Sequence, residues 1–287
     1  MERDILSLIA NESASFSKGQ KLISNYILEN YDKAAFMTAG KLGRTVGVSE
    51  STVVRFAAEL GFDGYPGMRK ALQEMIRNRL SSVQRIEVAK DMINNNNVLE
   101  TVMTADIDKL QVTLQEQDHA AFDAAVEAIL SAKHVYVVGM RSSASLAGFL
   151  GFYLNLLLDS VHVVNDTTVS EVYEQIIRIL EGDVFIGISY PRYSSRTLKA
   201  MKFAKSTGAK VIGLTDGKNS PFVGVADINL FAKSDMVSFL DSLVAPMSLI
   251  NALIVSIGMH TTETLSETFK TLEGVWAEYN VYEKFDN

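Results

Sequence analysis

From residue 132 onward the chain alternates short apolar runs with longer stretches of helical periodicity. Strands that alternate with helices of ten or more residues favour a parallel sheet with helices on both faces. The runs are apolar throughout, which is typical of strands that are buried on both sides. We therefore expect an α/β domain whose strands are the five runs at 134–138, 161–164, 183–188, 210–214 and 227–231.

Residues 1–90 carry a helical pattern instead. Apolar residues at spacings of three and four make 18–30 an amphipathic helix. Similar patterns predict helices at 38–45, at 49–60 and from 65 to about 80. The N-terminal part of the chain is therefore expected to be all-α.

Between these two parts lies a run of four asparagines at 94–97, which favours neither helix nor strand and predicts a hinge. A long amphipathic segment is expected after it, at 98–130. The predicted organisation is a helical domain over 1–80, a helical linker over 81–118 and an α/β domain over 119–287.

The net charge of −7 is unevenly distributed along the chain. Residues 1–90 hold 13 Lys or Arg and 10 Asp or Glu, a net charge of +3, and the remaining residues carry −10. A mildly basic N-terminal part joined to an acidic remainder fits a polyanion-binding module joined to a part that does not bind polyanions. An excess of three charges is weak evidence without a motif.

Other features narrow the functional classes. The chain has no cysteine and its four histidines lack the short spacing of a metal pair, so we expect neither a metal nor a cofactor. The charged N-terminus does not resemble a signal peptide. The most apolar stretch, 244–259, is shorter than the roughly 18–20 residues that cross a bilayer. We expect a cytoplasmic protein without a membrane partner.

The segment 38–62 contains the most informative local pattern. Thr38 can cap a short helix, and Gly47 supplies the positive φ that a tight turn after it requires. Ser49 can cap a second helix with a buried apolar stripe, which Gly61 then ends. A short helix, a glycine turn and a capped second helix form a helix-turn-helix.

The second helix of such a motif enters the major groove of double-stranded DNA with its N-terminal residues facing the bases. Arg55 can reach a guanine or a phosphate. The alternative is a plain three-helix bundle in which Arg55 is only a solvated charge. The candidate DNA contacts are the outward or forward side chains Lys41, Arg44, Ser49, Glu50, Ser51, Thr52 and Arg55.

The sequences VSESTVVRF at 48–56 and LGFDGY at 60–65 resemble the helix-turn-helix signature of the RpiR/MurR family of transcriptional regulators. The second half of that family is a sugar isomerase (SIS) domain. The resemblance therefore implies a five-stranded parallel sheet sandwiched by helices, and a phosphosugar-binding role. It also implies regulation of a carbohydrate-metabolism operon.

Two loops carry the SIS resemblance. VYVVGMRSS at 135–143 matches a strand followed by Gly-x-x-Ser at a helix start, and VFIGISYPRYS at 184–194 matches the second strand and loop. Serines and helix N-terminal N–H groups can hold an anion there. The candidate effector contacts are Arg141, Ser142, Ser143, Ser189, Arg192 and Ser194.

The second loop departs from the family pattern Ser-x-Ser-Gly-x-Thr. Proline and Arg192 replace the middle serine and the glycine. Two arginines and the two loop tyrosines can grip a carboxylate or a phosphate and stack on a sugar ring, so a sugar acid is possible as well as a sugar phosphate. Alternatively, the arginines form structural ion pairs and the serines only cap helices.

The rival class is a sugar-phosphate isomerase with an accessory helical N-terminus. Isomerisation requires a general base. Asp166, Glu171, Glu174 and His260 are candidates, but their spacing commits none of them to this role, and we assign no catalytic residue. We expect a homodimer or a tetramer that places two recognition helices on a palindromic operator, with the helices between 97 and 130 relaying the effector signal.

Overall fold

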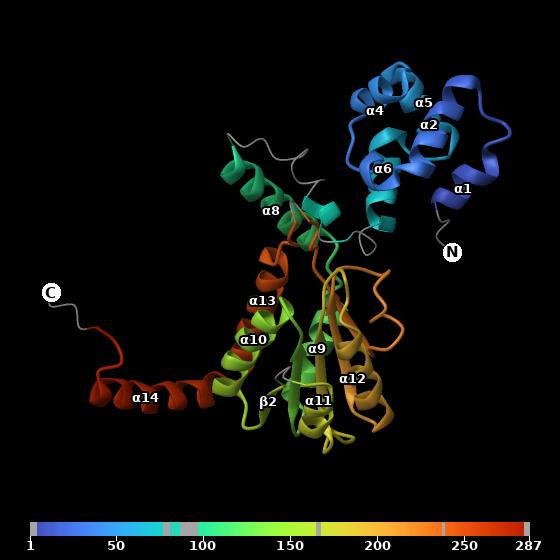
Figure 1. Ribbon diagram of the computed structural model, residues 1–287. Helices are drawn as coiled ribbons and strands as arrows, with labels where there is room; N and C mark the ends of the chain where they lie inside the picture. The colour runs from blue at the N-terminus through green and yellow to red at the C-terminus, as the bar shows by residue number, and fades with distance from the viewer. Residues whose placement is uncertain are drawn as a thin grey trace. The chain divides into compact units, whose positions relative to one another are not determined.

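The computed structural model describes residues 5–76, 81, 83–86, 97–164, 168–236 and 239–283. By its internal contacts the chain divides into two compact units, which we treat separately (Figure 1). Unit 1 consists of Met1–Val102 together with Met236–Asp241, and unit 2 consists of Met103–Asp235 and Ser242–Asn287.

Unit 1 is helical in its described part. Its core is a single apolar cluster, and Ile23, Leu42 and Phe56 are completely buried in it. Met236, from the segment between the last strand and α13, belongs to the same cluster. The helices are α1 (Ile5–Glu12), α2 (Lys18–Glu29), α3 (Tyr31–Ala34), α4 (Ala39–Val46), α5 (Glu50–Glu59) and α6 (Gly64–Ile76), followed by the first turn of α8 (Val98–Gln115).

Unit 2 is built on a five-stranded, all-parallel sheet with the order β2-β1-β3-β4-β5. The strands lie within one residue of the apolar runs that predicted them, because both faces of the sheet are covered. They are β1 (Val135–Gly139), β2 (Val161–Val164), β3 (Val184–Ile188), β4 (Lys210–Thr215) and β5 (Ile228–Phe231).

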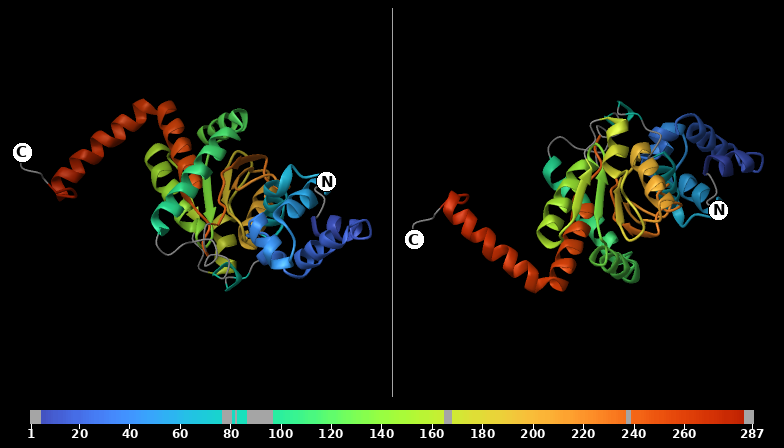
Figure 2. Two further views of the ribbon diagram at one scale, coloured as in Figure 1. Left: turned by 90° about the horizontal axis from the view of Figure 1, so that it is seen from above. Right: turned by 90° about the horizontal axis from the view of Figure 1, so that it is seen from below.

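Two layers of helices cover the sheet. Val135 and Val137 point to a core shared with α9 (His119–Leu130), α10 (Ser143–Leu157) and α13 (Val244–His260). Tyr136 and Val138 point to the opposite core, which α11 (Val169–Ile176) and α12 (Ser195–Ser206) complete. The α/β sandwich expected from the sequence is therefore confirmed (Figures 1 and 2).

The chain ends in α14 (Thr262–Tyr279). This helix leaves the rest of unit 2 at a bend of 99° to α13, as Figure 2 shows clearly. In the described ranges, no single helix is both long and apolar enough to cross a bilayer, and α13 and α14 meet that criterion only as a bent pair. α13 packs its buried side, including Leu249 and Leu253, against the sheet.

The amphipathic segment 98–130 forms two helices, because α8 ends at Gln115 and α9 begins at His119. The Asp118 carboxylate accepts a hydrogen bond from the Ala121 N–H and caps α9, which fixes the break. Of the asparagine run expected to form a hinge, 94–96 lie outside the described residues, as do 77–80 after α6.

Candidate DNA-binding and effector sites

The helix-turn-helix expected in unit 1 is formed by α4 and α5. The Thr38 hydroxyl caps α4 by accepting from the Lys41 N–H at 3.2 Å. Gly47 ends α4 in the left-handed region with φ 77°, where a side chain would be strained. The Ser49 hydroxyl then caps α5 by accepting from the Thr52 N–H at 3.2 Å. Each of these three roles follows from the residue type that the sequence supplies.

A second glycine sets the distance between the two helices. A Cβ at Gly43, on the inner side of α4, would lie 2.8 Å from the carbonyl oxygen of Val48 in the turn. The Gly43 carbonyl itself accepts from the Val48 N–H at 2.8 Å. Backbone therefore packs directly on backbone at the turn, which holds α5 in one orientation relative to α4.

The predicted DNA contacts lie on the surface of this motif. Five of them are exposed and two, Lys41 and Thr52, are half-buried. The Arg55 guanidinium reaches back to the Ser51 carbonyl at 3.4 Å, which leaves it on the outer side of α5. The exposed predicted contacts are Arg44, Ser49, Glu50, Ser51 and Arg55.

The outward face of α5 also contains two residues that the sequence reasoning missed. Val54 and Ala58 are exposed and, at helical spacing, share a face with Ser51 and Arg55. Apolar side chains on a recognition helix can contact thymine methyl groups. The sequence signal for Val54 is a valine at an outward position of the predicted helix, off its buried stripe.

The candidate effector loops of unit 2 meet at one edge of the sheet. β1 and β3 are adjacent and parallel, and their last residues, Gly139 and Ile188, are paired. The chain proceeds from β1 to β2 on one side and from β3 to β4 on the other, so the strand order reverses between β1 and β3. Ligands of open α/β sheets bind in the crevice at such a switch point.

The first loop is a tight turn from β1 into α10. A Cβ at Gly139 would lie 2.3 Å from the Ser143 carbonyl oxygen, so only glycine allows the strand end and the helix start to approach this closely. Arg141 is exposed and adopts φ 56°, in the left-handed region. Ser142 is exposed and its side chain does not cap α10, whereas Ser143 is buried.

The second loop, from β3 to α12, is held together by its own serines. The buried Ser189 hydroxyl accepts from the Ser194 N–H at 3.0 Å, and the Ser194 hydroxyl caps α12 through the Thr197 N–H at 3.2 Å. The capping role considered for Ser194 is therefore present. Arg192 is exposed between these serines and adopts φ 63°.

The sequence predicted that both loop tyrosines face a ligand, and the structure does not place both of them there. The Tyr190 ring lies in the core with α10 and α13, and burial, followed by the charge of Asp216, raises the pKa of its hydroxyl. That hydroxyl has no hydrogen-bond partner among the described residues. The Tyr193 hydroxyl donates to the Asp216 carboxylate at 2.7 Å, which joins the loop to the end of β4.

The left-handed conformation of both arginines is the most unusual backbone feature of the site. Arg141, Arg192 and Asn280 are the only non-glycine residues with positive φ in the described part of the chain. For a residue with a Cβ this conformation costs about 1–2 kcal/mol. Arg192 occupies the position at which the family pattern has glycine. This chain therefore has a charged side chain at a position where the backbone conformation is strained for any residue except glycine.

The candidate general bases are not brought together. Glu171 and Glu174 lie on α11 and His260 ends α13, on opposite faces of the sheet, and Asp166 lies outside the described residues. The histidines are less scattered than their spacing suggested, because the pairing of β1 with β2 brings the rings of His134 and His162 to 5.9 Å.

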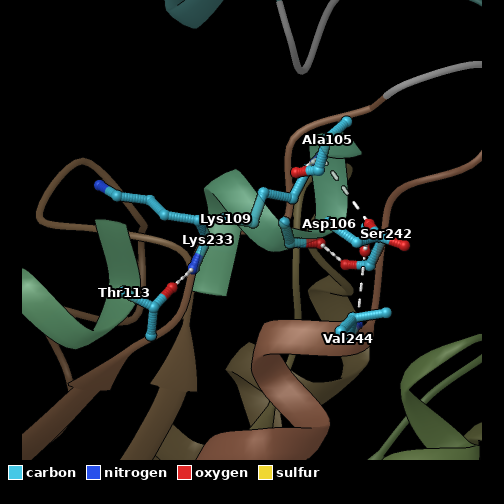
Figure 3. Close-up of polar contacts among 8 residues, drawn as sticks. Ala105, Asp106, Lys109, Thr113, Lys233, Ser242 and Val244 are labelled. Atoms are coloured by element: carbon cyan, nitrogen blue, oxygen red, sulfur yellow. Dashed lines mark hydrogen bonds and ion pairs between the residues drawn. The ribbon is translucent and has the colours of Figure 1, made fainter. Parts of the chain in front are cut away.

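α8, which falls in the expected linker, is fixed to unit 2 by polar contacts (Figure 3). The Ser242 hydroxyl donates to the Asp106 carboxylate at 2.6 Å, and the Thr113 hydroxyl accepts from the Lys233 N–H at 2.9 Å. Lys109 is buried between them and donates to the Ala105 carbonyl. α8 thus holds the chain on both sides of the segment 236–241.

Comparison with known proteins agrees with this two-part organisation. Residues 3–79 match the helix-turn-helix domain of the rpiR family, and residues 128–256 match the SIS domain. An uncharacterized HTH-type transcriptional regulator of Caldanaerobacter subterraneus subsp. tengcongensis is 24% identical over 259 residues, which cover 88% of this chain and 89% of that protein.

Two solved structures are similar. The sugar isomerase domain of an RpiR transcription factor from Sphaerobacter thermophilus is 33% identical, with a TM-score of 0.57, over 60% of this chain and 96% of that chain. The Vibrio vulnificus NanR protein, solved with ManNAc-6P, is 22% identical with a TM-score of 0.58, over 94% of this chain and 97% of its own. The chain belongs to the RpiR family of transcriptional regulators, which join a helix-turn-helix domain to an SIS domain, and is not an isomerase.

Proposed function

We propose that this regulator binds a palindromic operator of a carbohydrate-metabolism operon through α5, and that a sugar phosphate or sugar acid bound at 139–143 and 189–194 controls it. The observation that carries the effector proposal is the pair of exposed arginines at positive φ, on loops that begin at paired residues of β1 and β3. Backbone strain of this kind persists where the surrounding structure and function require it.

The chemistry of these loops favours an anion. Guanidinium groups form bidentate hydrogen bonds with phosphate and carboxylate, and the α10 and α12 N-termini face the same edge of the sheet. The ManNAc-6P bound by the similar NanR protein is of the same class, an anionic sugar.

The DNA-binding proposal depends on the outward face of α5. In this proposal Ser51, Val54 and Arg55 read base edges, while Lys41 and Arg44 hold backbone phosphates. A homodimer or a tetramer supplies the second recognition helix, with half-sites about 10 base pairs apart. Such a regulator acts in the cytoplasm, where its operator lies.

The effector proposal is tested by thermal stability against ManNAc-6P, fructose 6-phosphate, 6-phosphogluconate and glucuronate, with inorganic phosphate as the control. A ligand at a hundred times its Kd stabilises the folded protein by about 2.7 kcal/mol, which is readily seen as a melting shift. We expect a shift with at least one sugar anion and none in Arg192→Ala. No shift across the panel, or an equal shift in Arg192→Ala, contradicts the proposed site.

The DNA proposal is tested by selecting bound sequences from a random duplex library with the full chain. We expect enrichment of an inverted repeat, and loss of that enrichment in Arg55→Ala. Recovery of the same repeat by Arg55→Ala would remove this arginine from base recognition. Failure to enrich any sequence would contradict specific DNA binding.

A further inference from the structure

The C-terminal helix α14 has an apolar stripe that the described part of the chain covers only in part. Leu265, Phe269, Leu272, Trp276 and Tyr279 recur at spacings of four and three, the pattern of a helix that packs along its length against a partner. None of the residues of α14 is buried, and Tyr279 is 71% exposed. Figure 2 shows the helix extending away from the sheet and its covering layers.

The charges of α14 lie away from this stripe. Glu263, Glu267, Lys270 and Glu278 occupy the opposite side of the helix at 100° per residue, and only Glu273 borders the stripe. Depletion of charge is the mark of the buried centre of a protein interface. The stripe is also continuous with the core of unit 2, because Leu265 at its base packs against that core beside Gly258.

The surface of unit 2 offers a second uncovered apolar area. α10 and α13 pack side by side on one face of the sheet, and α10 has no charged residue while α13 has only His260. Phe152 and Val255 are each 62% exposed on their outer sides. We call this surface, formed by Phe149, Phe152, Tyr153, Val255 and Met259, the α10–α13 patch.

We propose that α14 is an arm that packs on the α10–α13 patch of a second copy of this chain, and receives that copy's arm in return. One exchange covers both uncharged surfaces. A helix of 18 residues is about 27 Å long and about 10 Å wide, so a single arm supplies only part of the roughly 800 Å² per partner that a stable interface buries. A two-fold exchange doubles the contact, because each copy gives one arm and accepts one.

This inference bears on the homo-oligomer of the proposed function but depends on neither operator nor effector. Its test measures mass and proximity without DNA or ligand, so its failure can be distinguished from failure of the proposed function. Two properties of the sequence make the test direct: Trp276 is the only tryptophan, and the chain has no cysteine.

The first measurement is the mass of the full chain in solution, against 31.6 kDa for one copy. We expect Leu272→Glu, in the stripe, and Phe152→Glu, in the patch, each to halve the mass of the wild type. The control Lys270→Glu, on the outer side of α14, leaves it unchanged. Trp276 emission shifts to the red in Leu272→Glu, because the indole loses its cover. An unchanged mass in both variants overturns the proposal.

Proximity is tested with Leu272→Cys and Phe152→Cys, prepared separately, mixed, and treated with a short bis-maleimide. We expect a cross-link between the two different variants. Leu272→Cys linked only to itself would show that α14 pairs with another α14, and would overturn the assignment of the patch. Melting temperatures close to the wild type in both variants establish that unit 2 remains folded, since neither side chain is part of its buried core.

Discussion

Replacing Arg192 by glycine tests two statements about the effector loop: its backbone is strained at this residue, and the guanidinium binds the effector. At φ 63° an arginine costs about 1–2 kcal/mol relative to the usual conformation, and glycine removes this cost. The greater conformational freedom of glycine in the unfolded chain lowers the free energy of unfolding by about 0.5–1 kcal/mol. The difference is a stabilisation of about 0.5–1 kcal/mol, although a charged side chain has been removed.

For a unit of this size, 1 kcal/mol changes the Tm by about 2–4 °C. We therefore expect Arg192→Gly to melt about 2 °C above the wild type while losing the effector-induced shift. Lys202→Gly is the matched control, because it removes a positive charge from an exposed position in the interior of α12. In a helix interior glycine costs about 1 kcal/mol, so this control melts about 2–4 °C below the wild type.

Arg192→Ala separates the two contributions, because alanine removes the guanidinium and keeps the strained backbone. Calorimetry of the full chain with and without the sugar anion found in the panel gives both quantities. We expect alanine to melt below glycine and to bind no effector. If Arg192→Gly melts as far below the wild type as Lys202→Gly does, the loop is not strained and the reasoning is refuted.

Three further predictions concern backbone and DNA contacts. Arg55→Ala should lose about 1–3 kcal/mol of discrimination between the selected operator and a single-base variant of it. Lys41→Ala should weaken binding to both duplexes equally, and lower the slope of log affinity against log salt concentration by about one. Both are measured by fluorescence anisotropy, and wild-type discrimination in Arg55→Ala would be inconsistent with base reading. Gly139→Ala should destabilise unit 2 by about 3 kcal/mol in urea unfolding, because its Cβ would lie 2.3 Å from a carbonyl oxygen. The control Gly148→Ala has open space around its Cβ and should be neutral or stabilising. Similar effects of the two substitutions would contradict the close approach at Gly139. Gly47→Ala should cost unit 1 about 1 kcal/mol from φ 77° alone, since no atom lies within 4 Å of its Cβ; an unchanged unfolding midpoint would contradict the left-handed turn.

The elements of the sheet were predictable because burial on both faces leaves only apolar residues in the strands. Val184–Ile188 is buried at every position, so its sequence reads as one continuous run. The two caps of the helix-turn-helix were predictable for a similar reason, since Ser49 and Gly47 each satisfy a local backbone requirement. Local constraints of this kind are visible in the sequence itself.

The contacts that connect distant segments could not be predicted from local pattern. The Tyr193 hydroxyl meets Asp216 only because β3 and β4 are adjacent in the sheet. The break between α8 and α9 depends partly on Gln117, whose amide donates to the Phe231 carbonyl at 2.8 Å. The residue type of Arg192 gave no signal of its left-handed conformation, because glycine or asparagine usually occupies that region.

The chain passes between the two units three times, after residues 102, 235 and 241. The last two passes bound the segment Met236–Asp241, in which Asp241 pairs with the buried Arg85 of unit 1 at 2.9 Å. On the unit 2 side, α8 contacts residues on both sides of this segment, Lys233 and Ser242. In the proposed function, an effector that changes operator affinity by some factor requires that operator DNA change effector affinity by the same factor.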